Sequence, residues 1–252
     1  MLVIGAGLAT AACGTRTASV PALPPVPRLA MRGPAITTVQ HTGLLRVASD
    51  LSYPPMAYAE AGAPRGFEID LAGLLAGALG VRLEVVDTPV TTMRTAFPDG
   101  VDLLLSALPA GRAPGIPSTP YFVSREAILW RDGAAVRSTD ALRGLRVAVA
   151  AGMSGETLVA DAGALVVRYL PVDALSAVAD GRAQAAVGDG PLLLDFAQTH
   201  PHLGVTAGPW RETPFVAVAR PGAPDLAAFV SASIRDLRRS GGLDQLLRRW
   251  HL

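Results

Sequence analysis

The amino-acid sequence predicts an α/β fold with two lobes, each a mainly parallel sheet flanked by helices. Short apolar runs of strand length alternate with segments whose apolar residues repeat with the period of a helix. This alternation occurs in two successive rounds, which are separated near residues 127–137. Strands that alternate with helices indicate parallel sheets covered on both faces, so two rounds predict two lobes.

The first round predicts a short strand, a long helix and two further strands. The strand covers residues 45–48 and the helix covers residues 69–79, where apolar side chains recur at i, i+3, i+4, i+7 and i+8. Gly80 is placed to end that helix as a left-handed cap. The two further strands are expected at residues 82–86 and 101–105.

The second round repeats this order, and the chain then ends in two helices. A buried strand is expected at residues 145–150, and a helix begins near Ser154. The remaining expected elements are a helix at 173–180, strands at 185–187 and 216–219, and helices at 225–240 and 243–250.

Composition limits the function classes that are open to this chain. Its 252 residues are half apolar, which is enough for one large core or two smaller ones, and its formal net charge of +1 gives no reason to expect nucleic acid as a partner. A single cysteine, Cys13, forms neither an intrachain disulfide nor a cysteine metal site. Because the four histidines also lack the spacing of a helical metal pair, we expect no metal and no cofactor.

The first residues are typical of an export signal. Residues 2–12 form an uncharged apolar run that is shorter than the roughly 20 residues needed to span a bilayer, so we expect residues 1–12 to be a signal peptide. The run ends in TAACG (residues 10–14), which resembles a bacterial lipobox. This resemblance implies that Cys13 is acylated and becomes the new N-terminus. A plain secretory peptide with an incidental free thiol is the alternative.

Residues 13–42 are predicted to be a tether between this anchor and the folded lobes. Five prolines lie in the segment, which shows little periodicity. Such a composition does not bury a core and is typical of an extended spacer. A spacer suits a protein that must reach a partner at the membrane.

Polar residues follow several of the predicted strands. In open α/β sheets, ligands bind beyond the carboxyl ends of the strands, so these residues are the candidate site. They are Asp50, Tyr53, Ser106, Ser154 and Asp189.

These side chains, together with Arg112, have the chemistry to complement a zwitterion. Asp50 and Asp189 can each receive an ammonium group, and a dry cleft strengthens such a pair. Ser154 at a helix start suits a carboxylate, which the planar fork of Arg112 can also bind. Tyr53 offers a flat apolar wall. Each residue also has a purely structural explanation, since an Asp or Ser at a helix start is often only a cap.

A series of segments, in one order, resembles the extracellular solute-binding proteins of polar amino-acid ABC transporters. The resemblance extends from about Gly43 to Trp250. The segments are LRVASDLSYPPM (45–56), GFEIDL (66–71), VDLLLS (101–106), PYF (120–122), LRGLRVAV (142–149), GMS (152–154), GRAQAAVGD (181–189) and the final stretch 241–250.

The resemblance implies a periplasmic-binding-protein-like fold, in which two crossing strands join the lobes and the chain returns to the first lobe. Lobe 1 is expected at residues 43–126 plus 214–252, and lobe 2 at residues 127–213. The resemblance also implies that Asp189 holds the α-amino group of the ligand. Further ligand contacts are implied for Asp50, Tyr53, Ser106 and Ser154.

The function implied is that of a binding protein and not of an enzyme. We expect a monomer outside the cell membrane, tethered by lipidated Cys13, that closes around a small polar ligand, an amino acid. It would then deliver this ligand to the permease of an ABC transporter.

One segment departs from the family and leaves alternatives open. After Ser106 the family usually has a Thr-x-Glu-Arg stretch whose arginine binds the ligand carboxylate, whereas this chain has LPAGRAP (108–114). Either Arg112 binds the ligand carboxylate or this interaction is absent. The LPAG stretch also resembles binding-protein-like partners of periplasmic quinoprotein alcohol dehydrogenases. A dehydratase on the same fold is a further alternative.

Overall fold

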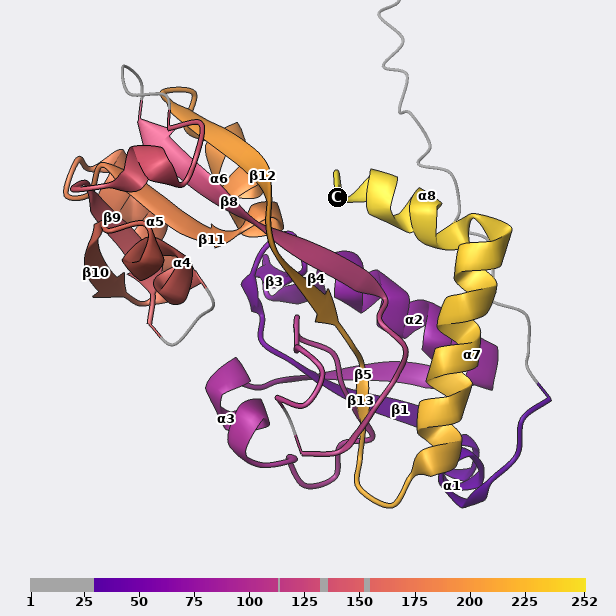
Figure 1. The fold of residues 1–252 in the computed structure, drawn as a ribbon. Coiled ribbons are helices and arrows are strands. Elements are labelled where there is room, and N and C mark those ends of the chain that lie inside the picture. The colour runs from indigo at the N-terminus through magenta and orange to yellow at the C-terminus, as the bar shows by residue number, and fades with distance from the viewer. Residues whose placement is uncertain (1–29, 113, 132–135, 152–154) are drawn as a thin grey trace, which may run out of the picture.

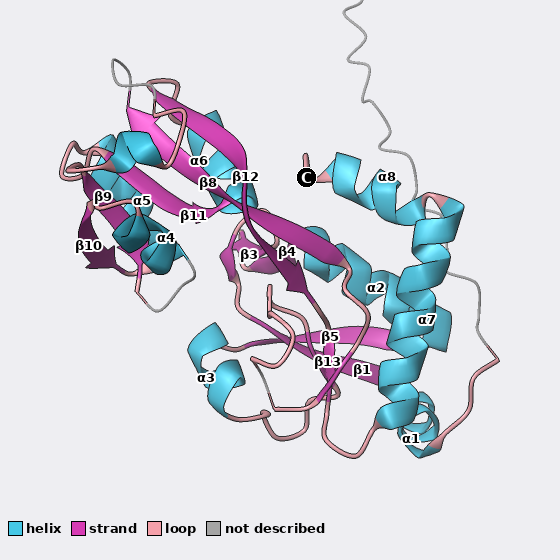
Figure 2. Cartoon of the chain, viewed as in Figure 1, coloured by secondary structure: helices cyan, strands magenta, loops and turns pink. Residues whose placement is uncertain are grey.

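The computed structural model describes residues 30–112, 114–131, 136–151 and 155–252, arranged as two α/β lobes (Figure 1). The predicted signal peptide, the lipidated Cys13 and Ser154 lie outside the described residues and stay predictions. Within the described ranges, no helix combines the length and the apolarity needed to cross a bilayer. Figure 2 shows that helices flank the sheets of both lobes, as the sequence predicts.

The sheet of lobe 1 has the strand order β5-β1-β6-β13-β7. Its first three strands are parallel, and the last two run antiparallel to their neighbours. The strands are β1 (Leu44–Ser49), β5 (Arg82–Asp87), β6 (Leu103–Leu104), β7 (Ile116–Pro117) and β13 (Val218–Ala219).

Both faces of this sheet are buried, which explains why β1 reads as an almost continuous apolar run. Leu45 and Val47 of β1 pack into the core formed with α2 (Phe67–Leu79), α7 (Pro224–Ser240) and α8 (Gly242–Arg249). Ala48 points to the other face, where it joins Met93 of α3 (Val90–Thr95). A small sheet of β2 (Ser52–Tyr53), β3 (Ala57–Glu60) and β4 (Ala63–Arg65) follows β1.

Lobe 2 is built around a mixed sheet with the order β10-β9-β11-β8-β12. β9 (Arg146–Ala150), β10 (Leu165–Tyr169) and β11 (Ala185–Asp189) are parallel, and β8 and β12 run antiparallel to their neighbours. The two faces of the sheet belong to two separate hydrophobic clusters. The helical elements of the lobe are η1 (Asp140–Leu142), α4 (Gly155–Asp161), α5 (Pro171–Ala179) and α6 (Gly190–Gln198).

Two long strands join the lobes, β8 (Phe122–Arg131) and β12 (Leu203–Phe215) (Figure 1). They pair with each other antiparallel, with a register shift between Ala207 and Glu212. Their lobe-1 ends, Phe122 and Phe215, pack into the core of that lobe. The predicted crossing strands are thus present, and the predicted lobe limits at 126/127 and 213/214 fall inside them.

The predicted tether is wrong at its C-terminal end, because residues 34–42 form helix α1 (Pro34–Thr42). Ile36 and Val39 are buried against lobe 1, and the Ile36 N–H donates to Asp225 Oδ2 of α7 at 2.9 Å. The proline that suggested a spacer stands at the first helical position, where its missing N–H costs no hydrogen bond. The Ile36–Val39 spacing of three residues is the signal that the tether interpretation overlooked.

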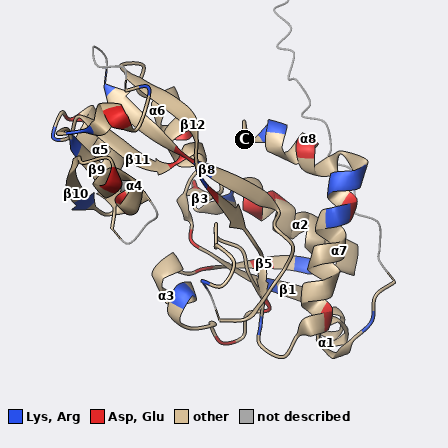
Figure 3. Cartoon of the chain, viewed as in Figure 1, with Lys and Arg blue, Asp and Glu red and all other residues tan. Residues whose placement is uncertain are grey.

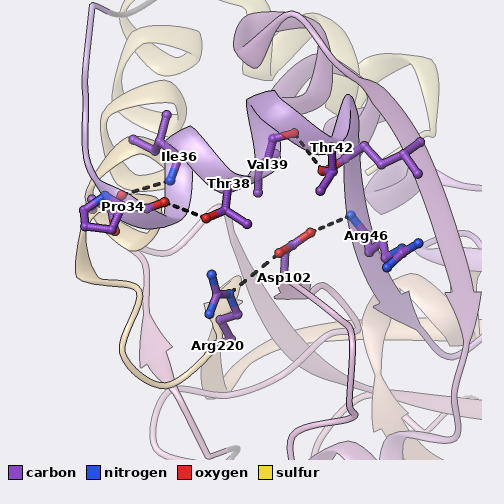
Figure 4. Close-up of polar contacts among 10 residues, drawn as sticks. Pro34, Ile36, Thr38, Val39, Thr42, Arg46, Asp102 and Arg220 are labelled. Atoms are coloured by element: carbon purple, nitrogen blue, oxygen red, sulfur yellow. Dashed lines mark hydrogen bonds and ion pairs between the residues drawn. The ribbon is translucent and has the colours of Figure 1, made fainter.

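Asp102, which directly precedes β6, contacts the chain on both sides of that strand (Figure 4). Its Oδ2 accepts a hydrogen bond from the Arg46 N–H at 3.0 Å, and its Oδ1 lies 3.7 Å from Arg220 Nε. The Arg220 N–H in turn donates to the Asp102 carbonyl at 3.0 Å. These contacts hold the β1 and β13 regions on either side of β6.

Candidate functional site

Asp189 is the last residue of β11, and its carboxylate accepts hydrogen bonds from two hydroxyl groups. Tyr53 Oη donates to Oδ2 at 2.5 Å, and Ser124 Oγ donates to Oδ1 at 2.9 Å. Tyr53 belongs to lobe 1 and Ser124 to the crossing strand β8, so three parts of the fold meet at one carboxylate. The next residue is Gly190, where a Cβ would come within 2.9 Å of the Arg125 carbonyl oxygen, so a larger residue would displace this turn.

Tyr53 bridges the two lobes. Its ring packs against the core of lobe 1 and also against the α5–α6 cluster of lobe 2. Burial raises the pKa of its hydroxyl well above the usual value, and the neighbouring Asp189 charge raises it further. The hydroxyl therefore stays protonated and acts as a donor to Asp189, which leaves the negative charge on the carboxylate.

Asp50 is close to this site, but its carboxylate already has backbone partners. Oδ1 accepts from the N–H of Ser52 at 3.1 Å and from its hydroxyl at 2.5 Å, and Oδ2 accepts from the Val90 N–H at 2.8 Å. Ser106 Oγ accepts from the Asp50 N–H at 3.1 Å. Asp50 and Ser106 thus hold the loop after β1 and the start of α3 in place at the edge of the sheet.

A cleft between the lobes contains most of the predicted site residues. Two cavities that share Asp189 lie in this cleft. The smaller one, of about 100 Å³, is lined by Asp50, Tyr53, Ser106 and Asp189. A larger cavity of about 570 Å³ is lined by Arg112 and Asp189. Five of the six predicted ligand contacts therefore share one cleft, and the sixth, Ser154, is outside the described residues.

Several further residues at this cleft are absent from the sequence-based prediction, among them Arg94 and Ser124. Arg94 of α3 lines both cavities, and Ser124 binds Asp189 directly. Arg94 comes seven residues after the end of β5, in the helix that follows this strand, and not directly at the strand end as Asp50 does. Ser124 lies inside a long strand, where sequence alone does not show that its hydroxyl faces a carboxylate.

The backbone at the centre of the cleft is positioned by a buried carboxyl group. Glu68 Oε1 accepts from the Ala107 N–H at 2.7 Å and from the Tyr121 hydroxyl. Ala107 lines both cavities and has a φ of 47°, a left-handed conformation that an L-residue rarely adopts without support. Burial raises the pKa of Glu68 to about 7, against the opposing effect of its hydrogen bonds.

The lining of the larger cavity is suited to the recognition of charged groups. No cluster of three or more His, Cys, Asp or Glu side chains arranged to hold a metal occurs among the residues that the structure describes. Basic and acidic residues are scattered over the helices and strands of both lobes (Figure 3). The larger cavity, in contrast, is lined by four arginines and two carboxylates.

Comparison with known sequences identifies the family. The sequence model of the bacterial extracellular solute-binding proteins, family 3, matches residues 45–252. The chain belongs to this family. The match starts at β1 and includes both lobes, the crossing strands and the two C-terminal helices, so it spans every element that forms the cleft.

Several named proteins are similar to this chain. It is 27% identical over 219 residues to the amino-acid-binding protein AabA of Dichelobacter nodosus, a match covering 79% of this chain and 86% of that protein. A crystal structure of a mutant ArgBP from T. maritima superposes with a TM-score of 0.72 and 28% identity, over 86% of this chain and 99% of the other. The crystal structure of an ancestral amino acid-binding protein, AncCDT-1, described as a precursor of cyclohexadienyl dehydratase, superposes with a TM-score of 0.74 and 26% identity. This match also covers 86% of this chain and 99% of the other. These similarities confirm the predicted two-lobed fold.

Proposed function

We propose that this chain captures an amino acid in the cleft between its lobes and delivers it to the permease of an ABC transporter. The observation that carries the proposal is the Asp189 carboxylate, which reaches the cleft from lobe 2 and meets Tyr53 of lobe 1. A carboxylate held there by hydroxyl donors can receive a ligand ammonium group. The amino-acid-binding relatives support this choice of ligand class.

Closure of the two lobes is the proposed mechanism. The ligand binds to one lobe, and its contacts to the other lobe stabilise the closed form. We propose the lobes as predicted, 43–126 plus 214–252 and 127–213, with bending in β8 and β12 where these limits fall. The register shift in β12 supports this assignment, because an irregular ladder holds fewer paired groups that would resist bending.

A test of the site uses the change Asp189→Ala. Removing the carboxylate leaves the ligand ammonium without its counter-charge in the cleft, so affinity for the bound amino acid should fall more than about tenfold. Thermal-shift screening against amino acids, amines and small organic acids identifies the ligand, since ligand binding to the folded state raises its melting temperature. Calorimetry then measures the loss.

The matched control is Asp244→Ala, which removes an exposed carboxylate on α8, away from the cleft. This variant should bind as the unchanged protein does. An unchanged dissociation constant in Asp189→Ala would remove Asp189 from the site.

We also propose that Cys13 carries a lipid anchor, as the TAACG stretch predicts. An anchored binding protein stays near its membrane partner, which agrees with the extracellular family. When the protein is expressed in bacteria, Cys13→Ala should move it from the membrane fraction to the soluble fraction. Equal partitioning of both forms would favour the plain secretory peptide.

We propose that the chain binds its ligand without transforming it. The relatives named as amino-acid-binding proteins support this, although AncCDT-1 is described as the precursor of a dehydratase. Stoichiometric, reversible binding is expected, and steady turnover of a prephenate-like acid would contradict it. Co-purification with a quinoprotein and no amino-acid binding would instead favour the dehydrogenase-partner alternative.

A further inference from the structure

Arginine side chains outnumber carboxylates around the larger cavity of the cleft. Arg94 of α3 and Arg112 come from lobe 1, Arg168 of β10 from lobe 2, and Arg211 from the crossing strand β12. Because the cations come from every part of the fold that borders the cleft, a ligand held between the lobes meets positive charge on several sides.

The carboxylates at the cleft are mostly committed to partners within the protein. Glu156 Oε1 lies 2.5 Å from Arg168 Nη2, and this ion pair neutralises one arginine as well. Asp50 accepts hydrogen bonds from the backbone N–H groups of Ser52 and Val90. Asp189 accepts hydrogen bonds from two hydroxyl groups and, among the described residues, forms no ion pair, so its negative charge remains available to a cation.

Two of the arginines have no such partner. In the part of the chain that the structure describes, no carboxylate forms an ion pair with Arg112 or Arg211, although both side chains line the cavity. Unpaired charges of one sign in a cleft raise the local concentration of a ligand with the opposite sign. Outside the Glu156–Arg168 ion pair, the larger cavity therefore offers one carboxylate, Asp189, together with the guanidinium groups of Arg112 and Arg211.

From this arrangement we propose that the ligand is a dicarboxylic amino acid. This inference rests on the proposed function and names its substrate class. The α-ammonium group meets Asp189, and the two carboxylates meet the arginines, whose planar forks bind carboxylates with two parallel hydrogen bonds. A neutral amide side chain accepts weaker hydrogen bonds there, and a cationic side chain faces like charge.

The experiment measures dissociation constants of the purified chain by calorimetry. The ligands are glutamate and aspartate, their neutral amides glutamine and asparagine, the cationic arginine and lysine, and glutarate, which lacks the ammonium group. At least one dicarboxylic amino acid should bind more than about tenfold more tightly than its amide, because charge-assisted hydrogen bonds are roughly twice as strong as neutral ones.

The possible failures are distinguishable. If glutamine, asparagine or arginine binds as tightly as glutamate and aspartate do, the charge assignment is wrong while the proposed function stands. If glutarate binds as tightly as glutamate, the ligand class is a dicarboxylate and not an amino acid. If no amino acid binds at all, the proposed function itself fails.

Two variants connect the preference to the named side chains. Arg112→Gln and Arg211→Gln each remove one positive charge and keep hydrogen-bond donors. Since both side chains are exposed and screened, each variant should lower the glutamate-to-glutamine affinity ratio only about threefold. Arg248→Gln, on the exposed face of α8, is the matched control and should leave the ratio unchanged. An unchanged ratio in both cleft variants overturns the proposal.

Discussion

At the scale of single residues, Glu68 shows how a buried carboxyl group shapes the cleft. It lies under the site with no exposed surface and holds the left-handed backbone of Ala107 in place. Glu68 does not line either cavity, so it acts on ligand binding through the backbone that it positions. A positioning role of this kind explains why a helix start carries a buried acid.

The raised pKa of Glu68 makes the stability of the fold depend on pH. Its folded pKa of about 7 exceeds the ordinary value of 4.5, so between these values the folded protein binds the proton more tightly than the unfolded chain does. This contribution is complete below about pH 4.5 and is lost as pH rises through about 7, by up to about 3 kcal/mol.

The change Glu68→Gln should remove this dependence, because an amide accepts the same hydrogen bonds without titrating. Urea unfolding at pH 5 and pH 8 measures the effect. We expect the unchanged protein to lose more stability between these pH values than the variant does. Glu60→Gln, an exposed position on β3, is the control. Equal losses in the Glu68 variant and the unchanged protein would show that Glu68 does not titrate in this range.

At the scale of secondary-structure elements, α1 extends lobe 1 beyond its predicted start. The helix packs Ala35, Ile36 and Val39 into the core that α7 and α8 share. The Ile36 N–H is one of the first backbone donors of α1, which no preceding turn can satisfy, and Asp225 accepts its hydrogen bond. The helix is thus part of the folded domain, and a tether ends before residue 34.

The packing of α1 predicts a stability change. Ile36→Ala removes a side chain that is 1% exposed and should lower the free energy of unfolding by about 2–4 kcal/mol. Urea unfolding measures this value. Thr37→Ala, on the exposed side of the same helix, should change it by less than about 0.5 kcal/mol. A cost near zero for Ile36→Ala would restore the interpretation of residues 34–42 as a spacer.

At the scale of the whole molecule, the crossing strands determine how the two lobes can move relative to each other. Only β8 and β12 carry the chain between the lobe bodies, while Tyr53 and Asp189 join them through one hydrogen bond in the described part of the cleft. Two paired strands bend more easily than either packed lobe deforms. A ligand that contacts both lobes therefore has a simple way to change the shape of the molecule.

Closure predicts a smaller radius of gyration in solution when ligand is saturating. Small-angle X-ray scattering of the purified chain, with and without its amino acid, measures this change. The variant Asp189→Ala should show no decrease at the same ligand concentration, since it binds more weakly. An unchanged radius in the ligand-saturated, unmodified protein would contradict hinge closure, although it would leave ligand binding intact.

Much of the fold and part of the site could be predicted from local patterns. Asp50, Ser106 and Asp189 were selected because each follows a predicted strand, and the carboxyl ends of parallel strands meet at one edge. Arg94 lies seven residues beyond β5, in a helix that is only six residues long and shows too little periodicity to be placed. Ser124 gave no signal, because its role depends on which strand pairs with β8.

The sequence by itself determined the alternation of strands and helices, the two rounds and the family, since these follow from hydrophobic period and from motifs in a fixed order. Only the tertiary structure decided that Asp50 is bound by backbone N–H groups while Asp189 accepts from the hydroxyl groups of Tyr53 and Ser124, and that four arginines share the cleft. The physical reason is that hydrogen bonds and charge balance depend on distances between residues far apart in the chain, which local periodicity does not specify.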